Sequence, residues 1–316
     1  MRLGYRCAGL ALLVVPVAPF LRADATVRYH TDIQTTPLLP AAALDQALGG
    51  MRDMVIQIKG NRAYTSQGPI TAIANLVTQD LTLIDRANKR FATLPAAQYA
   101  QELKNAVPAV PEQARAALAA MKTNLEFRST GRTASIQGIQ AEEQEFVLTV
   151  DMALPGGPAP STPFMKMVMQ VWTAKPEEAQ RVPALQEFRN YTASASSAMN
   201  PGEMIRQVLS AMPGLGDNLT EMMEERAKNG AMTLRTHMEL SMPFLAAMSQ
   251  QLPGQALPAG FDPNAPLMQM SQEVVELSTS PVDEAIFQVP ADYQPASLEE
   301  ILKGIVSAPT PPQFKQ

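Results

Sequence analysis

Methionine is the residue type whose number and spacing could do chemistry in this chain of 316 residues. There are 19 methionines against 10 phenylalanines, and Met165, Met167 and Met169 recur at every second position. Soft thioethers can bind Cu(I), and flexible methionine side chains also fit irregular apolar ligands. The same spacing puts all three on one face of a strand. Copper binding, an apolar cavity and a plain filled core are therefore three open interpretations.

The cavity interpretation draws on methionines from strand-like runs and from helical stripes, which would line the space between a sheet and its helices. The candidate ligand-binding residues are Met165, Met167, Met169, Met204, Met222, Met223, Met232, Met238 and Met242.

Histidine offers a weaker candidate for catalysis. The chain has two histidines, His30 and His237, which are too few for a usual zinc site. His237 stands between Arg235 and Glu239 and could act as a general base in a hydrolase, but alternating charges on a strand usually pair or solvate a sheet face. No nucleophile elbow, H-E-x-x-H, phosphate loop or dinucleotide glycine pattern occurs. We therefore expect no catalytic residue, no metal and no cofactor.

Carboxylates near predicted turns are also candidates. Glu142, Glu143 and Glu145 could serve as catalytic acids, although a solvated edge next to a turn explains them more simply. The run from 85 to 90 combines Asp, Asn, Lys and Arg, which indicates a turn and protection of a sheet edge.

The amino-terminal segment reads as an export signal. Two arginines precede an apolar run over residues 8–20, and Ala23 with Ala25 fits cleavage after Ala25. A retained membrane anchor is the alternative to a cleaved signal. The run is too short for a membrane span and its two prolines disfavour a helix, so cleavage is favoured. We expect a periplasmic or secreted protein with no transmembrane segment in the mature chain. Cys7 is the one cysteine, so the mature chain would have no disulfide.

Charge limits the partners. The chain has 25 basic and 30 acidic residues and no basic stripe, which makes nucleic acid a poor partner because phosphate contacts supply most of that affinity. With 46% apolar residues it can build a large core.

The elements that would position these residues are mainly strands. Alternation over Met54–Pro95 predicts four short antiparallel strands, with a two-residue turn at Gly60-Asn61. Further strands are predicted over 125–129, 134–140, 144–152, 164–174 and 232–242, and a closing hairpin over 274–279 and 284–289. Helices are predicted over about 95–121, in an insert at about 183–230, at 243–251, and at 297–305, where Ser297 and Glu300 form a capping box.

A family resemblance follows from several short segments in order. IKGNRAY, LTLID followed by NKRF, GRTASIQGIQAEEQEF and a late IFQVPADY resemble bacterial envelope proteins of unknown function with a LolA-like fold, the fold of the outer-membrane lipoprotein carriers. That resemblance implies a curved antiparallel sheet, or half-barrel, covered by helices on one face. It also implies an apolar cavity that shields acyl chains, so a lipid or a lipoprotein acyl chain is the partner it suggests.

The sequence therefore predicts an α+β protein with a signal peptide at 1–25, one LolA-like domain at 26–305 and a disordered tail at 306–316. The expected function is non-enzymatic binding or carriage of an apolar ligand. The alternatives are an interaction protein with a filled core, a Cu(I) binder, or a hydrolase using the polar sheet face. The sequence leaves the oligomeric state open.

Overall fold

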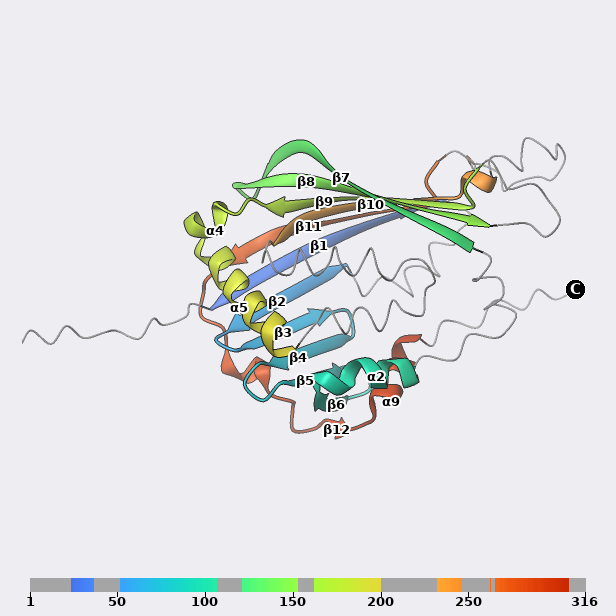
Figure 1. The fold of residues 1–316 in the computed structure, drawn as a ribbon. Helices are drawn as coiled ribbons and strands as arrows, with labels where there is room; N and C mark the ends of the chain where they lie inside the picture. The colour runs from blue at the N-terminus through green and yellow to red at the C-terminus, as the bar shows by residue number, and fades with distance from the viewer. Residues whose placement is uncertain are drawn as a thin grey trace, which may run out of the picture.

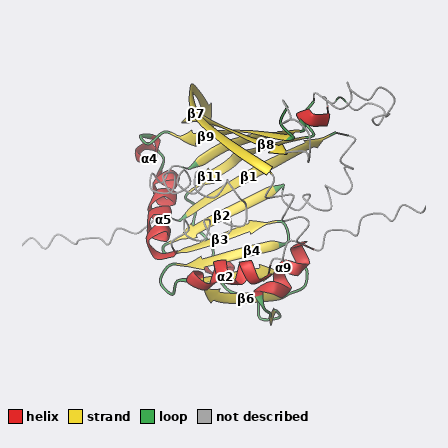
Figure 2. Ribbon diagram, turned by 45° about the vertical axis from the view of Figure 1, so that its right-hand side comes forward, coloured by secondary structure: helices red, strands yellow, loops and turns green. Residues whose placement is uncertain are grey.

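The computed structural model describes residues 24–36, 52–106, 121–152, 162–199, 232–245, 262 and 265–306. Its strands form one large, mostly antiparallel sheet of 12 strands that does not close on itself, with few helices (Figures 1 and 2). The order along the sheet is β12-β6-β5-β4-β3-β2-β1-β11-β10-β9-β8-β7, and β12 with β6 is the parallel pair. The predicted antiparallel sheet is thus confirmed.

The strands are β1 (Ala25–Thr35), β2 (Asp53–Lys59), β3 (Arg62–Gln67), β4 (Ile70–Asn75), β5 (Asp80–Asp85), β6 (Arg90–Pro95), β7 (Met121–Ile136), β8 (Ile139–Met152), β9 (Met165–Ala174), β10 (Thr233–Ser241), β11 (Met268–Ser278) and β12 (Gln294–Pro295). The helices are α2 (Ala96–Ala106), α4 (Glu178–Arg181), α5 (Pro183–Met199), the 3-10 turn η2 (Glu284–Phe287) and α9 (Leu298–Val306). None of these described helices is long and apolar enough to cross a membrane.

The stretch from 54 to 95 forms five strands, and the prediction of four was wrong. Asp85 accepts hydrogen bonds from the backbone N–H groups of Ala87 and Asn88 at 3.0 and 3.1 Å. Together with the positive φ of Lys89 (52°), these bonds reverse the chain tightly. The short run after Arg90, which looked like an exit from the sheet, therefore pairs back on β5 as β6.

The β7–β8 hairpin turns later than predicted. Gln137 and Gly138 both have positive φ, 50° and 74°, and join the strands as a two-residue turn. The strand predicted over 125–129 and the start of the one predicted over 134–140 are parts of one strand, β7, and the residues between them form an irregularity where the register shifts between Ser129 and Thr133. Gly131 supplies the positive φ (72°) there. Gly138 thus lies in the hairpin turn, and Gly131 lies in the irregular part of β7.

The middle of the sheet joins distant parts of the chain. No strand was predicted at Ala25–Thr35, yet these residues form β1, which pairs with β2 on one side and β11 on the other. The predicted hairpin of 274–279 with 284–289 was wrong, because β11 lies between β1 and β10 and residues Glu284–Phe287 form η2. The strand β10 was predicted correctly.

Helices pack on one face of the sheet at β1–β6. Opposed residues of an antiparallel pair share a face, so Val27 of β1 lies in one row with Leu83 of β5 and Ala92 of β6. Leu83 and Ala92 form a buried cluster with Leu298 and Ile301 of α9, against which α2 also packs. The helix α5 packs on the same face, over β1, β2 and β3. We call this side the helix-covered face.

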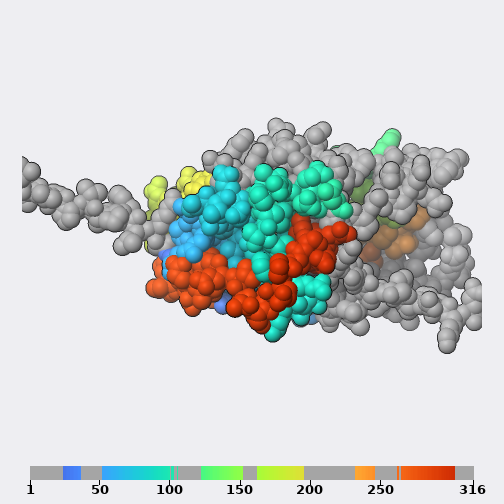
Figure 3. Space-filling model, turned by 90° about the horizontal axis from the view of Figure 1, so that it is seen from below, coloured from blue at the N-terminus to red at the C-terminus, as the bar shows by residue number. Residues whose placement is uncertain are grey.

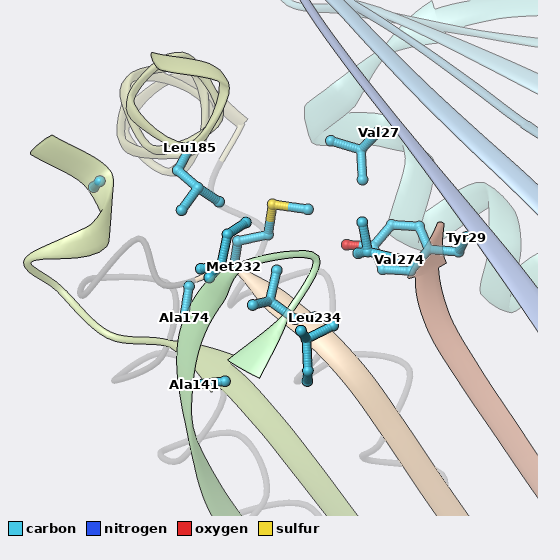
Figure 4. Packing of buried hydrophobic residues seen from close by; sticks show 11 residues of the cluster. Val27, Tyr29, Ala141, Ala174, Leu185, Met232, Leu234 and Val274 are labelled. Atoms are coloured by element: carbon cyan, nitrogen blue, oxygen red, sulfur yellow. The ribbon is translucent and has the colours of Figure 1, made fainter. Parts of the chain in front are cut away.

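A larger core cluster lies at one end of the strands and is built from residues of β1 and β7–β11 together with α4 and α5 (Figure 4). Val27, Leu234 and Val274 are fully buried there, with Leu185 of α5 and Met232 beside them. Tyr29 donates a hydrogen bond to the carbonyl of Thr233 at 2.9 Å, and burial raises the pKa of its hydroxyl far above the ordinary value. The elements α4 and α5 therefore seal this end of the sheet.

The segment 282–306 lies against the strands β2–β6, as Figure 3 shows from below. Lys59 donates to the carbonyl of Val282 at 2.6 Å, and the Arg62 guanidinium lies 4.7 Å from the Phe287 ring centroid. The chain then forms β12 and reaches α9, whose predicted capping box is confirmed by the bonds between Ser297 and Glu300.

The predicted domain limits are only partly within the described residues. Ala25 is fully buried at the start of β1, and the Asp24 carboxylate accepts from the N–H of Val282 at 2.7 Å. Residues 1–23, the insert residues 200–231, residues 246–251 of a predicted helix and the tail residues 307–316 lie outside the described residues.

Candidate apolar binding face

Two rows of side chains cross six neighbouring strands, from β7 to β1, and both are apolar on the five strands from β7 to β11. The strand registers place these residues opposite one another, so each row lies on a single face. The first row is Phe127, Phe146, Met169, Met238, Met270 and Ile33. The second is Leu125, Leu148, Met167, Leu240, Met268 and Thr35. We call these the methionine rows.

The methionine rows lie on the helix-covered face. Ile33 alternates in step with Val27 and Tyr29 along β1, whose pairing with β2 is regular. Tyr29 is opposite Val274, and from that pair to the end of β1 the register with β11 is also regular. Because Val27 and Tyr29 point into the core beside α5, the rows extend the same side of the sheet away from it.

Burial differs between the two parts of this face. At the α5 end, Val27, Leu234 and Val274 have no exposed surface. Along the methionine rows, Phe146 and Leu148 are buried, whereas the five methionines are all half-buried. Phe127, at the end of the first row, is 52% exposed. The rows therefore keep some thioether surface accessible where the core cluster keeps none.

The predicted ligand-binding methionines fall into three groups. Met167, Met169 and Met238 belong to the methionine rows, and the half-buried Met165 lies opposite Val150 one step further along β9. Met242 follows β10 and is half-buried. Met232 is 2% exposed and fills the core cluster. The predicted residues Met204, Met222 and Met223 lie outside the described residues.

Of the residues in the methionine rows, only Met167, Met169 and Met238 were predicted as binding residues, and Met268, Met270 and Ile33 are among those missed. Met268 and Met270 have the same alternate spacing as the β9 methionines, a signal that was present but lay after a proline-rich stretch read as loop. Ile33 was missed because β1 itself was not predicted. The register brings Met270 opposite both Met238 and Ile33.

The opposite face of β7–β11 is mainly polar, with Val147, Val168 and Trp172 among its charged and amide side chains, and we call it the polar face. His237 Nε2 lies 3.3 Å from Glu239 Oε1, so the predicted neighbours do meet. Arg235 does not join them, because its Nε donates to Glu273 at 2.7 Å. Ser271 lies opposite His237 in the register, and no hydrogen bond joins the two side chains within the described residues. This arrangement is a set of paired charges on a sheet face rather than an activated nucleophile.

The glutamates of β8 differ from the predicted solvated edge. Glu142 is exposed, 3.3 Å from Lys175, but Glu143 and Glu145 are buried on the polar face. The solvated-edge prediction was wrong for these two because arginines of β7 cover them. Arg132 binds Glu143, and Arg128 Nε donates to Glu145 at 2.8 Å.

The electrostatics of Glu145 follow from this cover. Burial disfavours its charged form, but hydrogen bonds from Arg128 and Gln170 and the nearby charge of Arg132 outweigh that cost. The pKa of the Glu145 carboxyl is therefore held below its ordinary value. An ionised, arginine-bound carboxylate is a poor general acid, so the ion pair of Glu145 with Arg128 is better explained by a structural role.

Within the described part of the chain, no three His, Cys, Asp or Glu side chains gather as a metal site. Comparison of the sequence with protein-family models and with curated proteins gives no match.

Proposed function

We propose that this protein binds an apolar, chain-like ligand along the methionine rows of the helix-covered face. The observation that carries the proposal is the pair of rows themselves, which are apolar across the five strands from β7 to β11 and contain five half-buried methionines; the first row continues to Ile33 of β1. Methionine suits such a surface because its flexible side chain adapts to ligands of varied shape. A strip of this length matches an extended hydrocarbon better than a compact polar metabolite.

The family resemblance supports the same function. A half-open antiparallel sheet with helices on one face is the architecture expected of a LolA-like protein, and the apolar ligand would then be a lipid or a lipoprotein acyl chain. We extend the proposal to its place in the cell: the chain acts as an exported envelope binder, non-enzymatic, in the periplasm or outside the cell.

The test compares two neighbouring residues of β9 that point to opposite faces. Met169→Glu puts a carboxylate in the first methionine row, where a bound hydrocarbon would have to desolvate it. Val168→Glu puts the same charge on the polar face, at a position that is also half-buried. Binding of a dansyl-labelled fatty acid, followed by fluorescence titration, should weaken at least tenfold in the first variant and change less than twofold in the second.

Circular dichroism of both variants serves as the folding control. Leu240→Glu provides a second variant in the other row and should weaken binding similarly. Equal loss of affinity in Met169→Glu and Val168→Glu, or unaltered affinity in both row variants, would overturn the proposal.

A further inference from the structure

The strand β7 ends the sheet on the side away from β12. Among the described strands it pairs with β8 alone, so one of its backbone edges faces outward. Every described residue from Glu126 to Ser129 is exposed, and Lys122 and Asn124 are exposed as well. A long exposed edge can accept another strand through its backbone N–H and C=O groups.

The β7 edge also carries an apolar contact. Phe127 is one of three large apolar side chains that are strongly exposed within the described residues. Its ring lies 5.1 Å from the Phe146 ring, centroid to centroid, at the end of the first methionine row. An added strand would cover the exposed side of Phe127 and continue that row.

A second copy of this chain is the partner whose charges can be checked directly. The outward N–H and C=O groups of an edge strand recur at every second residue, so a two-fold antiparallel pairing must be centred on a residue. Centring on Leu125 would place Lys122 opposite the partner's Arg128. Centring on Glu126 would place Glu126 opposite the partner's Glu126, and centring on Arg128 would place Arg128 opposite the partner's Arg128. Like charges directly opposed are unfavourable, so these three registers are disfavoured.

Centring on Phe127 gives the opposite result. Glu126 then faces the partner's Arg128, Arg128 faces the partner's Glu126, and the two Phe127 rings meet on the helix-covered face. Centring on Asn124 also pairs unlike charges, Lys122 with the partner's Glu126, but it leaves the Phe127 rings apart. The Phe127 register pairs Glu126 with Arg128 and covers the exposed ring. Five residues from its centre, Lys122 falls at the level of the partner's Arg132, which lies in the irregular part of β7 and binds Glu143.

We propose that β7 mediates a two-fold dimer in which β7 strands of two copies pair antiparallel about Phe127, joining two 12-stranded sheets. The contact involves few residues per copy, so the dimer is a concentration-dependent one. The pairing uses the β7 edge and Phe127 at the end of the first methionine row, and both of its tests are read without any ligand.

Cysteine cross-linking tests the register. The full chain with Cys7→Ser has no other cysteine, so Phe127→Cys in that background places one thiol per copy. Opposed residues of an antiparallel pair have Cβ atoms about 4.5 to 5.5 Å apart, close to disulfide distance. In the same register two Asn124→Cys thiols would be roughly 20 Å apart. Mild oxidation should therefore cross-link Phe127→Cys at least tenfold more than Asn124→Cys. Preferential cross-linking of Asn124→Cys, or equal yields, would overturn the proposal.

Sedimentation equilibrium of the chain with Phe127 intact tests the dimer itself. Glu126→Lys turns two attractive cross-strand pairs into repulsive ones and should raise the dissociation constant about tenfold. Glu102→Lys makes the same charge change on an exposed position of α2 and should leave the constant unaltered. A chain that stays monomeric up to millimolar concentration, or that responds equally to both variants, would contradict the dimer.

Discussion

The pair of Arg132 and Glu143 provides a sharp test of the packing of β7 on β8. The Glu143 side chain is 0% exposed, and its Oε2 atom has no hydrogen-bond partner among the described residues. Its charge is thus compensated through Oε1 by Arg132, whose own side chain is 55% exposed. Removing the arginine leaves a buried carboxylate without its counter-charge.

The cost follows from burial. Breaking a fully buried ion pair costs about 3 to 5 kcal/mol, and water at the half-exposed arginine reduces this, so Arg132→Ala should lower the free energy of unfolding by about 2 to 3 kcal/mol. Glu143→Gln keeps the size of the side chain but removes the charge. In that background, Arg132→Ala should cost less than about 1 kcal/mol.

Urea unfolding, followed by circular dichroism, measures this coupling in the unchanged protein, Arg132→Ala, Glu143→Gln and the double variant. A control is Arg90→Ala, since Arg90 is an exposed arginine at the first position of β6. If Arg132→Ala costs no more than Arg90→Ala, or costs the same with and without the Glu143 charge, the buried ion pair does not stabilise this hairpin.

Two further predictions concern the core and the pH dependence. Leu234→Ala, at a fully buried position, should cost about 2 to 5 kcal/mol in urea unfolding, whereas Val275→Ala, 45% exposed, should cost about 0.5 kcal/mol or less; similar costs would show that the core cluster is not packed as described. The hydrogen bond to Asp53 raises the pKa of His30, so its stabilising contribution is complete below the unfolded pKa and fades as pH rises through the folded one. Asp53→Asn should lower the NMR titration midpoint of His30, and an unchanged midpoint would contradict this contact.

Local patterns predicted the strands that alternate strictly. The run Thr233–Ser241 places apolar and polar residues at alternate positions, and the strand Met165–Ala174 repeats methionine at every second position, so the period of two identified both strands. The capping box of Ser297 and Glu300 was likewise visible, because its residues are close in sequence and bond to each other's backbone.

Long-range pairing was not visible in the sequence. The pair Thr26 with Ser278 joins residues far apart in the chain, and no local signal specifies that β1 lies between β2 and β11. The extra strand β6 depends on the turn that the Asp85 side chain caps. The hairpin turn lies at Gly138 and not near Gly131 because of the register of β7 with β8.

The candidate site was predicted in its residue type but not in its extent. Met167, Met169 and Met238 were identified from spacing, whereas Met268 and Met270 could be added only once the neighbours of β10 were known. Burial of Glu143 and Glu145 was missed because the sequence does not show that arginines of β7 would fold over them.

The central claim is that the methionine rows hold an apolar ligand, and native mass spectrometry of the purified chain tests it most directly. The proposal predicts mass additions from co-purified lipid that are released by organic solvent. These additions should be strongly reduced in Met169→Glu and retained in Val168→Glu. A chain that carries no lipid and takes up none when incubated with phospholipid vesicles or fatty acid would contradict the claim, and the rows would then be packed core.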